Sequence, residues 1–273
     1  MKTRKRVKGF LCSKTNTLEY MEEEAIEFLR KNEPEEGYSL AFSGGKDSIV
    51  TKKIAELAGV KFEPHYSCTG IDPPEVVKFI RQYHPDVKFY YPEKSFYQYI
   101  REKMPPLRRS RWCCDKLKKD PPKGKTKLKM IVGIRKEESF RRATRPIIDR
   151  LDKYTIHHKP IFNFLEWHIW ELIEKYNLLY PSLYDEEWDR IGCVVCPFIC
   201  NENQTKINRS KERWPGIYKT FEHAVKWWFY NKGCNQDNED PTEFKTHLEY
   251  LEWWYSGKHK DTEEDLPKHG FLL

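Results

Sequence analysis

The sequence predicts an α/β fold, with a parallel twisted sheet flanked by helices, an N-terminal helical extension and a helical C-terminal region. Between residues 37 and 134, short apolar runs alternate with amphipathic helical patterns, which is typical of a parallel sheet covered on both faces. Beyond about residue 160 the pattern changes to aromatic-rich helices, and five of the nine tryptophans follow residue 200. We therefore expect three parts: a basic arm and helix at 1–36, an α/β domain at 37–200, and a helical, aromatic-rich region at 201–273.

The spacing of apolar residues predicts the individual elements. A helix over about 18–31 is indicated by apolar residues on one face: Leu18, Met21, Ala25, Phe28 and Leu29. A strand over 38–42 precedes a second helix, in which apolar residues recur at helical spacing from Val50 to Ala58. Further strands are expected at 60–66, 87–91 and 128–134, and a helix that begins at Pro73 and Pro74 is expected to end near Tyr83.

The composition excludes several classes of protein. Of the 273 residues, 15% are aromatic and 33% are charged. The aromatic content argues against a disordered chain, because such chains lack the bulky side chains that offset the entropy of ordering. Charges interrupt every apolar stretch before the roughly 18 residues that a membrane helix needs. No signal-peptide hydrophobic region is visible near the start, so we expect a cytoplasmic protein with no membrane partner.

The net charge of +7 is concentrated in one segment. Residues 101–150 contain 18 basic and 6 acidic side chains, a local excess of +12. A field of this sign attracts polyanions such as nucleotides or nucleic acid, although a solvated basic face is the alternative. The adjacent His157 and His158 are expected to be a partly exposed pair, and the aromatic side chains beyond residue 160 are expected chiefly to pack rather than to stack on bases.

The segment Ser43-Gly44-Gly45-Lys46-Asp47-Ser48, between a strand and a helix, is the most informative local signal. Two glycines allow a tight turn with converging N–H groups, and the helix that follows presents its positive end. The Walker A pattern needs four residues between its first glycine and the Gly-Lys pair, so this is a different loop, with a geometry suited to pyrophosphate. The alternative is a Gly-Gly turn with a surface lysine.

Together with four further segments, this loop resembles the phosphoadenosine phosphosulfate (PAPS) reductase family, within the PP-loop adenine nucleotide alpha-hydrolase-like superfamily. The resemblance covers about residues 37–200. The further segments are Thr69-Gly70, Arg111 to Lys118, Gly133-Ile134-Arg135 with Glu138, Ser139 and Arg142, and a last block from Pro160-Ile161 through Leu183-Tyr184-Asp185 to Gly192-Cys193-Val194-Val195-Cys196-Pro197. The resemblance implies an adenine nucleotide, ATP or a relative, bound with Mg²⁺.

The resemblance also implies the residues of the nucleotide site. Lys46 and Asp47 are the expected catalytic residues, and the binding residues are expected to be Ser43, Gly44, Gly45, Lys46, Asp47, Ser48, Thr69, Gly70, Arg135, Ser139 and Arg142. Arg135 follows a predicted strand directly, and ligands of open α/β sheets bind at the carboxyl ends of strands. For the two arginines, the alternative is a surface position beside Glu137 or Glu138.

Five of the eight cysteines fall in two clusters, Cys113-Cys114 and Cys193-x2-Cys196-x3-Cys200, whereas Cys12, Cys68 and Cys234 stand alone. Such grouping points to metal ligands or catalytic thiols, with buried free thiols or a redox pair as the alternative. Four thiolates can bind zinc or a [4Fe–4S] cluster, and adjacent cysteines suit the larger cluster better. The similarity to adenylyl-sulfate reductases implies Cys113, Cys114, Cys193 and Cys196 as cluster ligands, although Cys200 could replace one of the tandem pair.

The sequence departs from the reductase pattern at the expected nucleophile. Family reductases carry a Glu-Cys-Gly-x-His segment, whereas this sequence ends at Lys268-His269-Gly270-Phe271-Leu272-Leu273, and Cys68 replaces the Asp before Thr-Gly. We therefore expect an enzyme that cleaves ATP to AMP and pyrophosphate to activate an acceptor for sulfur transfer. The alternatives are an adenylyl-sulfate or PAPS reductase, and a non-catalytic nucleotide- or nucleic-acid-binding subunit. The expected partners are a sulfur or electron donor protein and, as a further candidate, nucleic acid.

Overall fold

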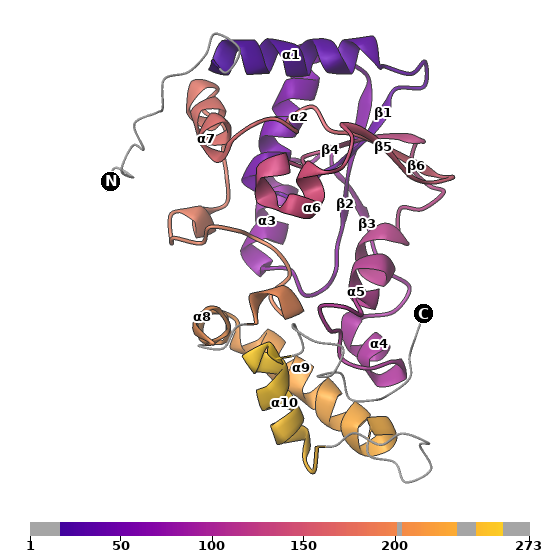
Figure 1. The fold of residues 1–273 in the computed structure, drawn as a ribbon, viewed down its shortest axis with the longest axis vertical. Helices are drawn as coiled ribbons and strands as arrows, with labels where there is room; N and C mark the ends of the chain where they lie inside the picture. The colour runs from indigo at the N-terminus through magenta and orange to yellow at the C-terminus, as the bar shows by residue number, and fades with distance from the viewer. Residues whose placement is uncertain (1–16, 201–203, 234–243, 259–273) are drawn as a thin grey trace. The chain divides into compact units, whose positions relative to one another are not determined.

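The computed structural model describes residues 17–200, 204–233 and 244–258, and Figure 1 shows the arrangement of its helices and strands. The strands are β1 (Tyr38–Ala41), β2 (Phe62–Ser67), β3 (Lys88–Tyr90), β4 (Lys129–Val132), β5 (Ile148–Asp152) and β6 (Thr155–His158). The helices of the first part of the chain are α1 (Leu18–Lys31), α2 (Lys46–Ala58), α3 (Pro74–Tyr83), α4 (Phe96–Glu102), α5 (Trp112–Cys114) and α6 (Phe140–Ala143). They are followed by α7 (Glu166–Lys175), α8 (Thr205–Arg213), α9 (Pro215–Trp228) and α10 (His247–Ser256).

The six strands form one mostly parallel sheet in the order β3-β2-β1-β4-β6-β5. Strand β1 lies between β2 and β4 and is parallel to both, with Leu40 opposite Pro64 on one side and Ile131 on the other. Strand β6 is parallel to β4, and only the pair β5–β6 is antiparallel. The predicted α/β class, with a helix before the sheet and helices after it, is therefore confirmed.

The centre of the sheet is apolar because its strands are covered by helices. Leu40 of β1 and Ile131 of β4 have no exposed surface, and neither do Val50 and Ile54 of helix α2. Helix α2 packs against β4, α1 and α7. An apolar stripe on α2 therefore holds the helix on the sheet, and it fixes the start of the helix beside the end of β1.

The described residues form two compact units whose segments interleave along the chain. The first unit contains the described residues up to Tyr66, together with Phe79–Lys88 and Gly124–Tyr184. The second contains Ser67–Lys78, Phe89–Lys123 and the described residues from Asp185 onward. The boundaries that the sequence suggests, after residues 36 and 200, stay a prediction.

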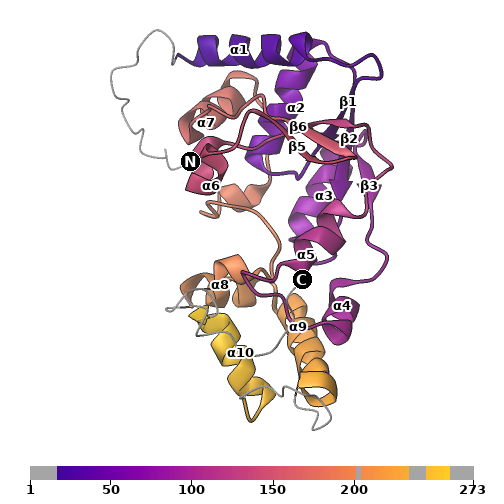
Figure 2. The ribbon, with the colours of Figure 1, turned by 45° about the vertical axis from the view of Figure 1, so that its right-hand side comes forward.

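Aromatic side chains form the core of the second unit. Phe221 of α9 contacts Phe96 of α4 and Trp254 of α10, with ring centroids 6.2 and 4.9 Å apart. The indole N–H of Trp254 donates to the carbonyl of Pro106 at 2.8 Å, so this fully buried ring has a polar partner as well as apolar neighbours. Helices α9 and α10 accordingly lie side by side (Figure 2).

Two features of the sheet differ from the sequence-based expectation. The hairpin of β5 and β6 is not predicted, because Ile148–Asp152 is largely exposed and carries charges at an edge of the sheet. The expected exposure of the histidine pair is wrong for His158, which is 2% exposed. Strand β6 lies between β4 and β5, and the His158 ring packs against Tyr38 with the centroids 5.3 Å apart.

The helices that the structure describes include none that is both long and apolar enough to cross a lipid bilayer.

The burial of His65 makes stability depend on pH. His65 lies in β2 and is 5% exposed, and burial lowers its pKa from 6.5 to about 4, although a bond with the backbone of Glu63 opposes the shift. Between pH 6.5 and about 4, this histidine binds a proton in the unfolded chain but not in the folded chain. The free energy of unfolding should therefore fall as the pH drops through this range, by up to about 1.4 kcal/mol per pH unit.

Urea denaturation between pH 7 and pH 4.5 measures this slope. The variant His65→Leu should show a shallower acid limb than the parent, whereas replacing the exposed His223 with Gln should leave the limb unchanged. Equal slopes in the parent and in His65→Leu would contradict the assignment.

Candidate functional site

The loop that follows β1 is held in a tight turn by its own side chains. Gly44 has a φ of 72°, which favours glycine, and Gly45 caps helix α2 without a side-chain hydrogen bond. The Ser48 hydroxyl donates to the Gly45 carbonyl at 2.8 Å, and the Ser43 hydroxyl donates to Ser48 Oγ at 3.2 Å. The N-terminus of α2 and its first N–H groups therefore follow directly on a glycine turn, which is the arrangement that binds anions in other proteins.

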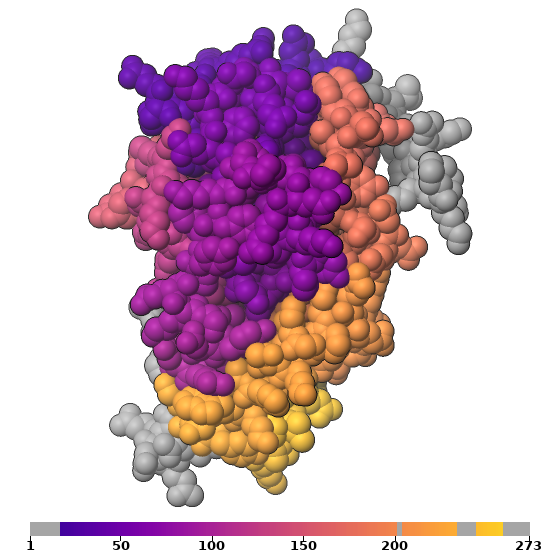
Figure 3. Space-filling model, turned by 180° about the vertical axis from the view of Figure 1, so that it is seen from behind, coloured from indigo at the N-terminus to yellow at the C-terminus, as the bar shows by residue number. Residues whose placement is uncertain are grey.

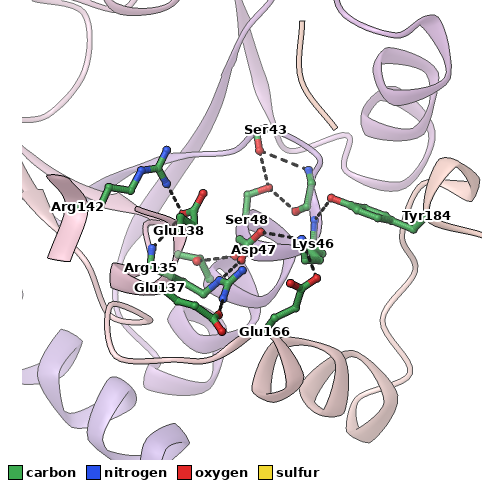
Figure 4. A network of polar contacts seen from close by, with 12 residues as sticks. Ser43, Lys46, Asp47, Ser48, Arg135, Glu137, Glu138, Arg142, Glu166 and Tyr184 are labelled. Atoms are coloured by element: carbon green, nitrogen blue, oxygen red, sulfur yellow. Dashed lines mark hydrogen bonds and ion pairs between the residues drawn. The ribbon is translucent and has the colours of Figure 1, made fainter. Parts of the chain in front are cut away.

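Lys46 is the first residue of α2, and its side chain is only 6% exposed. The ammonium group lies 3.6 Å from Asp47 Oδ2, 3.6 Å from Glu166 Oε1, and 5.4 Å from the ring centroid of Tyr184. The backbone N–H of Lys46 donates to the Tyr184 hydroxyl at 3.0 Å. Both the charge and the amide of Lys46 are thus fixed by residues more than 100 positions later in the chain (Figure 4).

Arg135 lies just beyond β4 and joins the same network. Its guanidinium is 5% exposed and donates to Asp47 Oδ1 at 2.5 Å and to the carboxylate of Glu137. Burial opposes the charge, but the two carboxylates outweigh it and raise the pKa of Arg135 above its ordinary value. Arg135 is therefore a buried residue held at the loop, and the surface position considered as the alternative is excluded for it.

Ser139 and Arg142 lie in the short segment after Arg135. The Ser139 hydroxyl accepts from the backbone N–H of Arg142 at 3.3 Å and caps α6, while the Arg142 guanidinium pairs with Glu138. The carboxylate of Glu138 also accepts from the backbone N–H of Arg135 at 3.2 Å. Glu138 therefore links Arg142 to the backbone of Arg135, and Ser139 caps the helix that contains Arg142. The pairing of Arg142 with Glu138 agrees with the alternative given for Arg142 in the sequence analysis.

The close approach of β4 to α2 depends on Gly133, the first residue of the matched segment Gly133-Ile134-Arg135. A Cβ atom on Gly133 would lie 2.8 Å from Thr51 Oγ1 and 3.0 Å from the carbonyl oxygen of Asp47. Only glycine allows the end of the strand to reach the first turn of the helix. The pair Asp47–Arg135 is possible because of this approach.

Carboxylates outnumber cations in the network around the loop. Lys46 and Arg135 supply two positive charges, and Asp47, Glu137 and Glu166 supply three negative charges. Glu166 and Tyr184 are contacts that sequence reasoning missed, whereas Glu137 was named there as an alternative partner of Arg135. Tyr184 lies within a matched segment, Leu183-Tyr184-Asp185, which was the available signal, whereas nothing in the local pattern distinguishes Glu166 from a surface glutamate.

The second unit contains the four predicted cysteine ligands. Cys113 and Cys114 lie in α5, and Cys193 and Cys196 lie in the segment before Pro197. A hydrogen bond to Cys114, burial, and negative charge at Cys114, Cys193 and Cys196 raise the pKa of Cys113. Cys113 therefore interacts electrostatically with each of the other three thiols. No group of three or more His, Cys, Asp or Glu side chains in the described ranges is close enough to hold a metal ion.

The thiols differ in their surroundings. A hydrogen bond from Cys113, with Lys118 and Arg111 nearby, lowers the pKa of Cys114 to about 6 even though burial opposes it. Burial raises the pKa of Cys193 to about 12, and its thiol contacts Thr69 Oγ1 and Asp72 Oδ1, each at 3.8 Å.

Two further predicted nucleotide residues belong to the second unit. Thr69 contacts Cys193, and Gly70 has a φ of 75°. Ser43 to Ser48, Arg135, Ser139 and Arg142 all belong to the first unit, where the structure brings them together. The fully buried Cys200 directs its thiol to the carbonyl of Cys196 at 3.9 Å. Cys12 and Cys234 lie outside the described residues.

Removing the buried cation between Asp47 and Glu137 should destabilise the first unit. In Arg135→Gln two carboxylates lose their charged donor, so the free energy of unfolding should fall by about 2–3 kcal/mol. The matched control is Arg141→Gln, which removes an exposed guanidinium from the same segment and should change stability by less than about 0.5 kcal/mol. Chemical denaturation measures both, and equal effects would contradict a structural role for the pair.

Known proteins similar to this chain were found by sequence and by structure. An uncharacterized protein of Methanocaldococcus jannaschii is 32% identical over 203 residues, which are 68% of this chain and 41% of that protein. A second uncharacterized protein of the same organism is 25% identical over 83% of this chain and 58% of its own length. The chain thus spans about two to three fifths of these relatives. The adenosine 5′-phosphosulfate reductase of Oceanobacillus iheyensis is 29% identical over 91 residues, 33% of this chain and 37% of the enzyme.

Among solved structures, the phosphoadenylyl-sulfate reductase of Candida auris, as a phosphate complex, has a TM-score of 0.46 at 16% identity and covers 68% of this chain and 98% of its own. The model of the phosphoadenosine phosphosulfate reductase domain matches residues 37–198, which is more than half of the sequence. The loop, the arginine segment and the Cys-x-x-Cys segment all fall within that range. The chain therefore belongs to the phosphoadenosine phosphosulfate reductase domain family, as the resemblance in its sequence implies.

Proposed function

We propose that this protein binds ATP at the loop Ser43–Ser48 and cleaves it between the α and β phosphates, which activates an acceptor for sulfur transfer. The observation that carries the proposal is the composition of the loop network. A buried lysine and a buried arginine stand among three carboxylates at the N-terminus of a helix. This combination suits a nucleotide that arrives with a divalent cation better than it suits an isolated anion.

Charge balance is the physical reason. A triphosphate alone would meet a network with one negative charge more than positive charges, so its approach would be opposed. ATP normally carries Mg²⁺, which proteins hold through one or two carboxylates together with phosphate oxygens. In this network, the carboxylates beside Lys46 that would bind Mg²⁺ are those of Asp47 and Glu166. Bound Mg²⁺ would neutralise charge on the phosphates.

Lys46 and the first turn of α2 would act on the leaving group. An acceptor oxygen forms a bond to the α-phosphorus, the bond from that phosphorus to the bridging oxygen breaks, and pyrophosphate leaves with the electron pair. The Lys46 ammonium and the N–H groups at the start of α2 stabilise the negative charge that develops on the departing oxygens. Sulfide or a thiolate then displaces AMP from the activated acceptor, and a carbon–sulfur bond replaces the carbon–oxygen bond.

The second candidate is a sulfonucleotide reductase, which the relatives favour. Two matched relatives are adenosine 5′-phosphosulfate reductases, at 29% and 28% identity over a third or less of this chain. In such a reaction a thiolate attacks the sulfur, AMP or the 3′-phosphorylated nucleotide leaves, and a dithiol reductant then releases sulfite from the thiosulfonate. Cys68, Cys234 or an external thiol would have to act as the nucleophile.

Cys113, Cys114, Cys193 and Cys196 fit a [4Fe–4S] cluster by the chemistry of their donor set. They are four half-buried thiols from two segments of one unit, and the cationic Lys118 interacts with Cys193 and Cys114. Since a cluster with four thiolates is anionic, a neighbouring ammonium stabilises it. When bound, the cluster would supply electrons or bind sulfide at an iron.

Replacing Lys46 tests the ATP reaction. The variant Lys46→Ala should release pyrophosphate from ATP about 10²- to 10³-fold more slowly, because the leaving group loses its cation. The control Lys53→Ala alters another lysine of α2, paired with Glu56, and should keep the parental rate. A coupled pyrophosphate assay with identification of AMP measures the reaction. Parent protein that leaves ATP intact and yields sulfite from adenylyl sulfate or PAPS with a thiol reductant would establish the second candidate instead.

Anaerobic purification tests the cluster. The parent protein should contain roughly four irons per chain with broad visible absorption, and replacement of Cys113 or Cys193 with Ser should remove most of the iron. The variants Cys68→Ser and Cys200→Ser should retain it, because neither thiol belongs to the proposed set. One zinc per chain in place of iron, or loss of iron in Cys200→Ser with retention in Cys113→Ser, would overturn this ligand assignment.

A further inference from the structure

Helix α9 has an outward face that is both basic and aromatic. Exposed positions at helical spacing on this face, from Lys219 into the turn after the helix, include Lys219, His223, Lys226, Trp227 and Tyr230. These five residues, here named the basic-aromatic stripe, include no acidic side chain. The opposite face of the helix is buried and consists of Tyr218, Phe221, Ala224, Val225 and Trp228. The apolar face therefore supplies the buried packing of the helix, and Tyr230 of the stripe also contacts His247 of α10.

Two rings of the stripe are unusually accessible. Trp227 is 41% exposed and Tyr230 is 51% exposed, whereas Trp214, Trp228 and Trp254 of the same unit are at most 8% exposed. The expectation that the late aromatic residues chiefly pack agrees with these three buried tryptophans, whereas Trp227 and Trp167 are 41% and 40% exposed. The segment 204–233, in orange, forms a substantial part of the surface in Figure 3.

Further cations extend the stripe. The Arg101 guanidinium of α4 lies 5.7 Å from the ring centroid of Trp227, and Lys232 donates to the backbone carbonyl of Glu102 at 2.9 Å. The nearby carboxylates are occupied elsewhere: Glu102 pairs with Lys94, and Glu222 contacts Lys211 and the Tyr255 hydroxyl. Among the described residues, both of these carboxylates are therefore engaged with partners outside the stripe.

We propose that the basic-aromatic stripe binds a single strand of nucleic acid. Such binding needs cations that follow the phosphates of the strand and rings on which unpaired bases stack. The stripe supplies both, with two lysines before Trp227 and Tyr230. From Lys219 to Tyr230 the helix axis rises by about 17 Å, which is the length of roughly five stacked nucleotides. An acidic protein would use the cations but would gain little from the exposed rings. This inference is independent of the nucleotide chemistry assigned to the first unit.

Fluorescence anisotropy with a labelled 12-nucleotide oligouridylate, in the absence of ATP, tests the proposal on the full chain. Affinity should fall with salt with a logarithmic slope of roughly −2 to −3, as expected for four phosphate contacts at most. The variant Trp227→Ala should bind about 5- to 100-fold more weakly, because it loses a stacking surface. Trp167→Ala removes an equally exposed tryptophan (40%) from α7 and should bind like the parent.

Charge reversal tests the lysines of the stripe separately from its aromatic rings. Lys219→Glu with Lys226→Glu should weaken binding and reduce the salt slope by about 1 to 2, whereas Lys31→Glu with Lys61→Glu, on exposed positions of the first unit, should not. A thermal melt confirms that each variant is folded. Oligothymidylate and a duplex of the same length serve as comparison strands, and weaker binding of the duplex is expected.

Three results would overturn the proposal: no binding by the parent protein, equal binding by Trp227→Ala and the parent, or competition by polyglutamate as strong as competition by unlabelled oligouridylate. The last result would assign the stripe to an acidic protein. Loss of ATP cleavage with retained strand binding would contradict only the proposed function.

Discussion

The carboxylate of Asp47 is the interaction on which the candidate site depends. It contacts the ammonium of Lys46 on its own helix and the guanidinium of Arg135 at the end of β4. Two cations that repel one another are thereby held at one place in a largely buried setting, where an unpaired charge would be costly. The contact also joins the start of α2 to the strand beside β1, so the loop, the helix and the sheet edge are fixed relative to one another.

Much of this arrangement follows from local sequence. The glycines and serines of the loop specify a turn between a strand and a helix, and the apolar spacing from Val50 onward specifies which face of α2 packs on the sheet. Both are short-range effects that a pattern can express. The position of Arg135 could be expected in the same way, since it depends only on the end of β4 and the rule that parallel strands place their carboxyl ends at one edge.

Long-range contacts could not be expected in this way. Tyr184 reaches Lys46 across 138 positions, and Glu166 reaches the same ammonium from another helix. Nothing in the spacing of either residue differs from that of an ordinary tyrosine or glutamate. The hairpin β5–β6 was not predicted for a different reason. An exposed, charged edge strand lacks the alternation of apolar and polar residues that marks a half-buried strand. The cysteine clusters were visible as groups, but their common surroundings in the second unit depend on tertiary folding.

The interleaving of the two units has a consequence for any attempt to divide the protein. The chain passes from one unit to the other after Tyr66, Lys78, Lys88, Lys123 and Tyr184. No cut at a single point can therefore separate the two units. A cut after Tyr184 keeps every segment of the first unit, but the same fragment still carries Ser67–Lys78 and Phe89–Lys123 of the second. Genetic dissection of one unit without the other must therefore rely on point substitutions rather than on fragments.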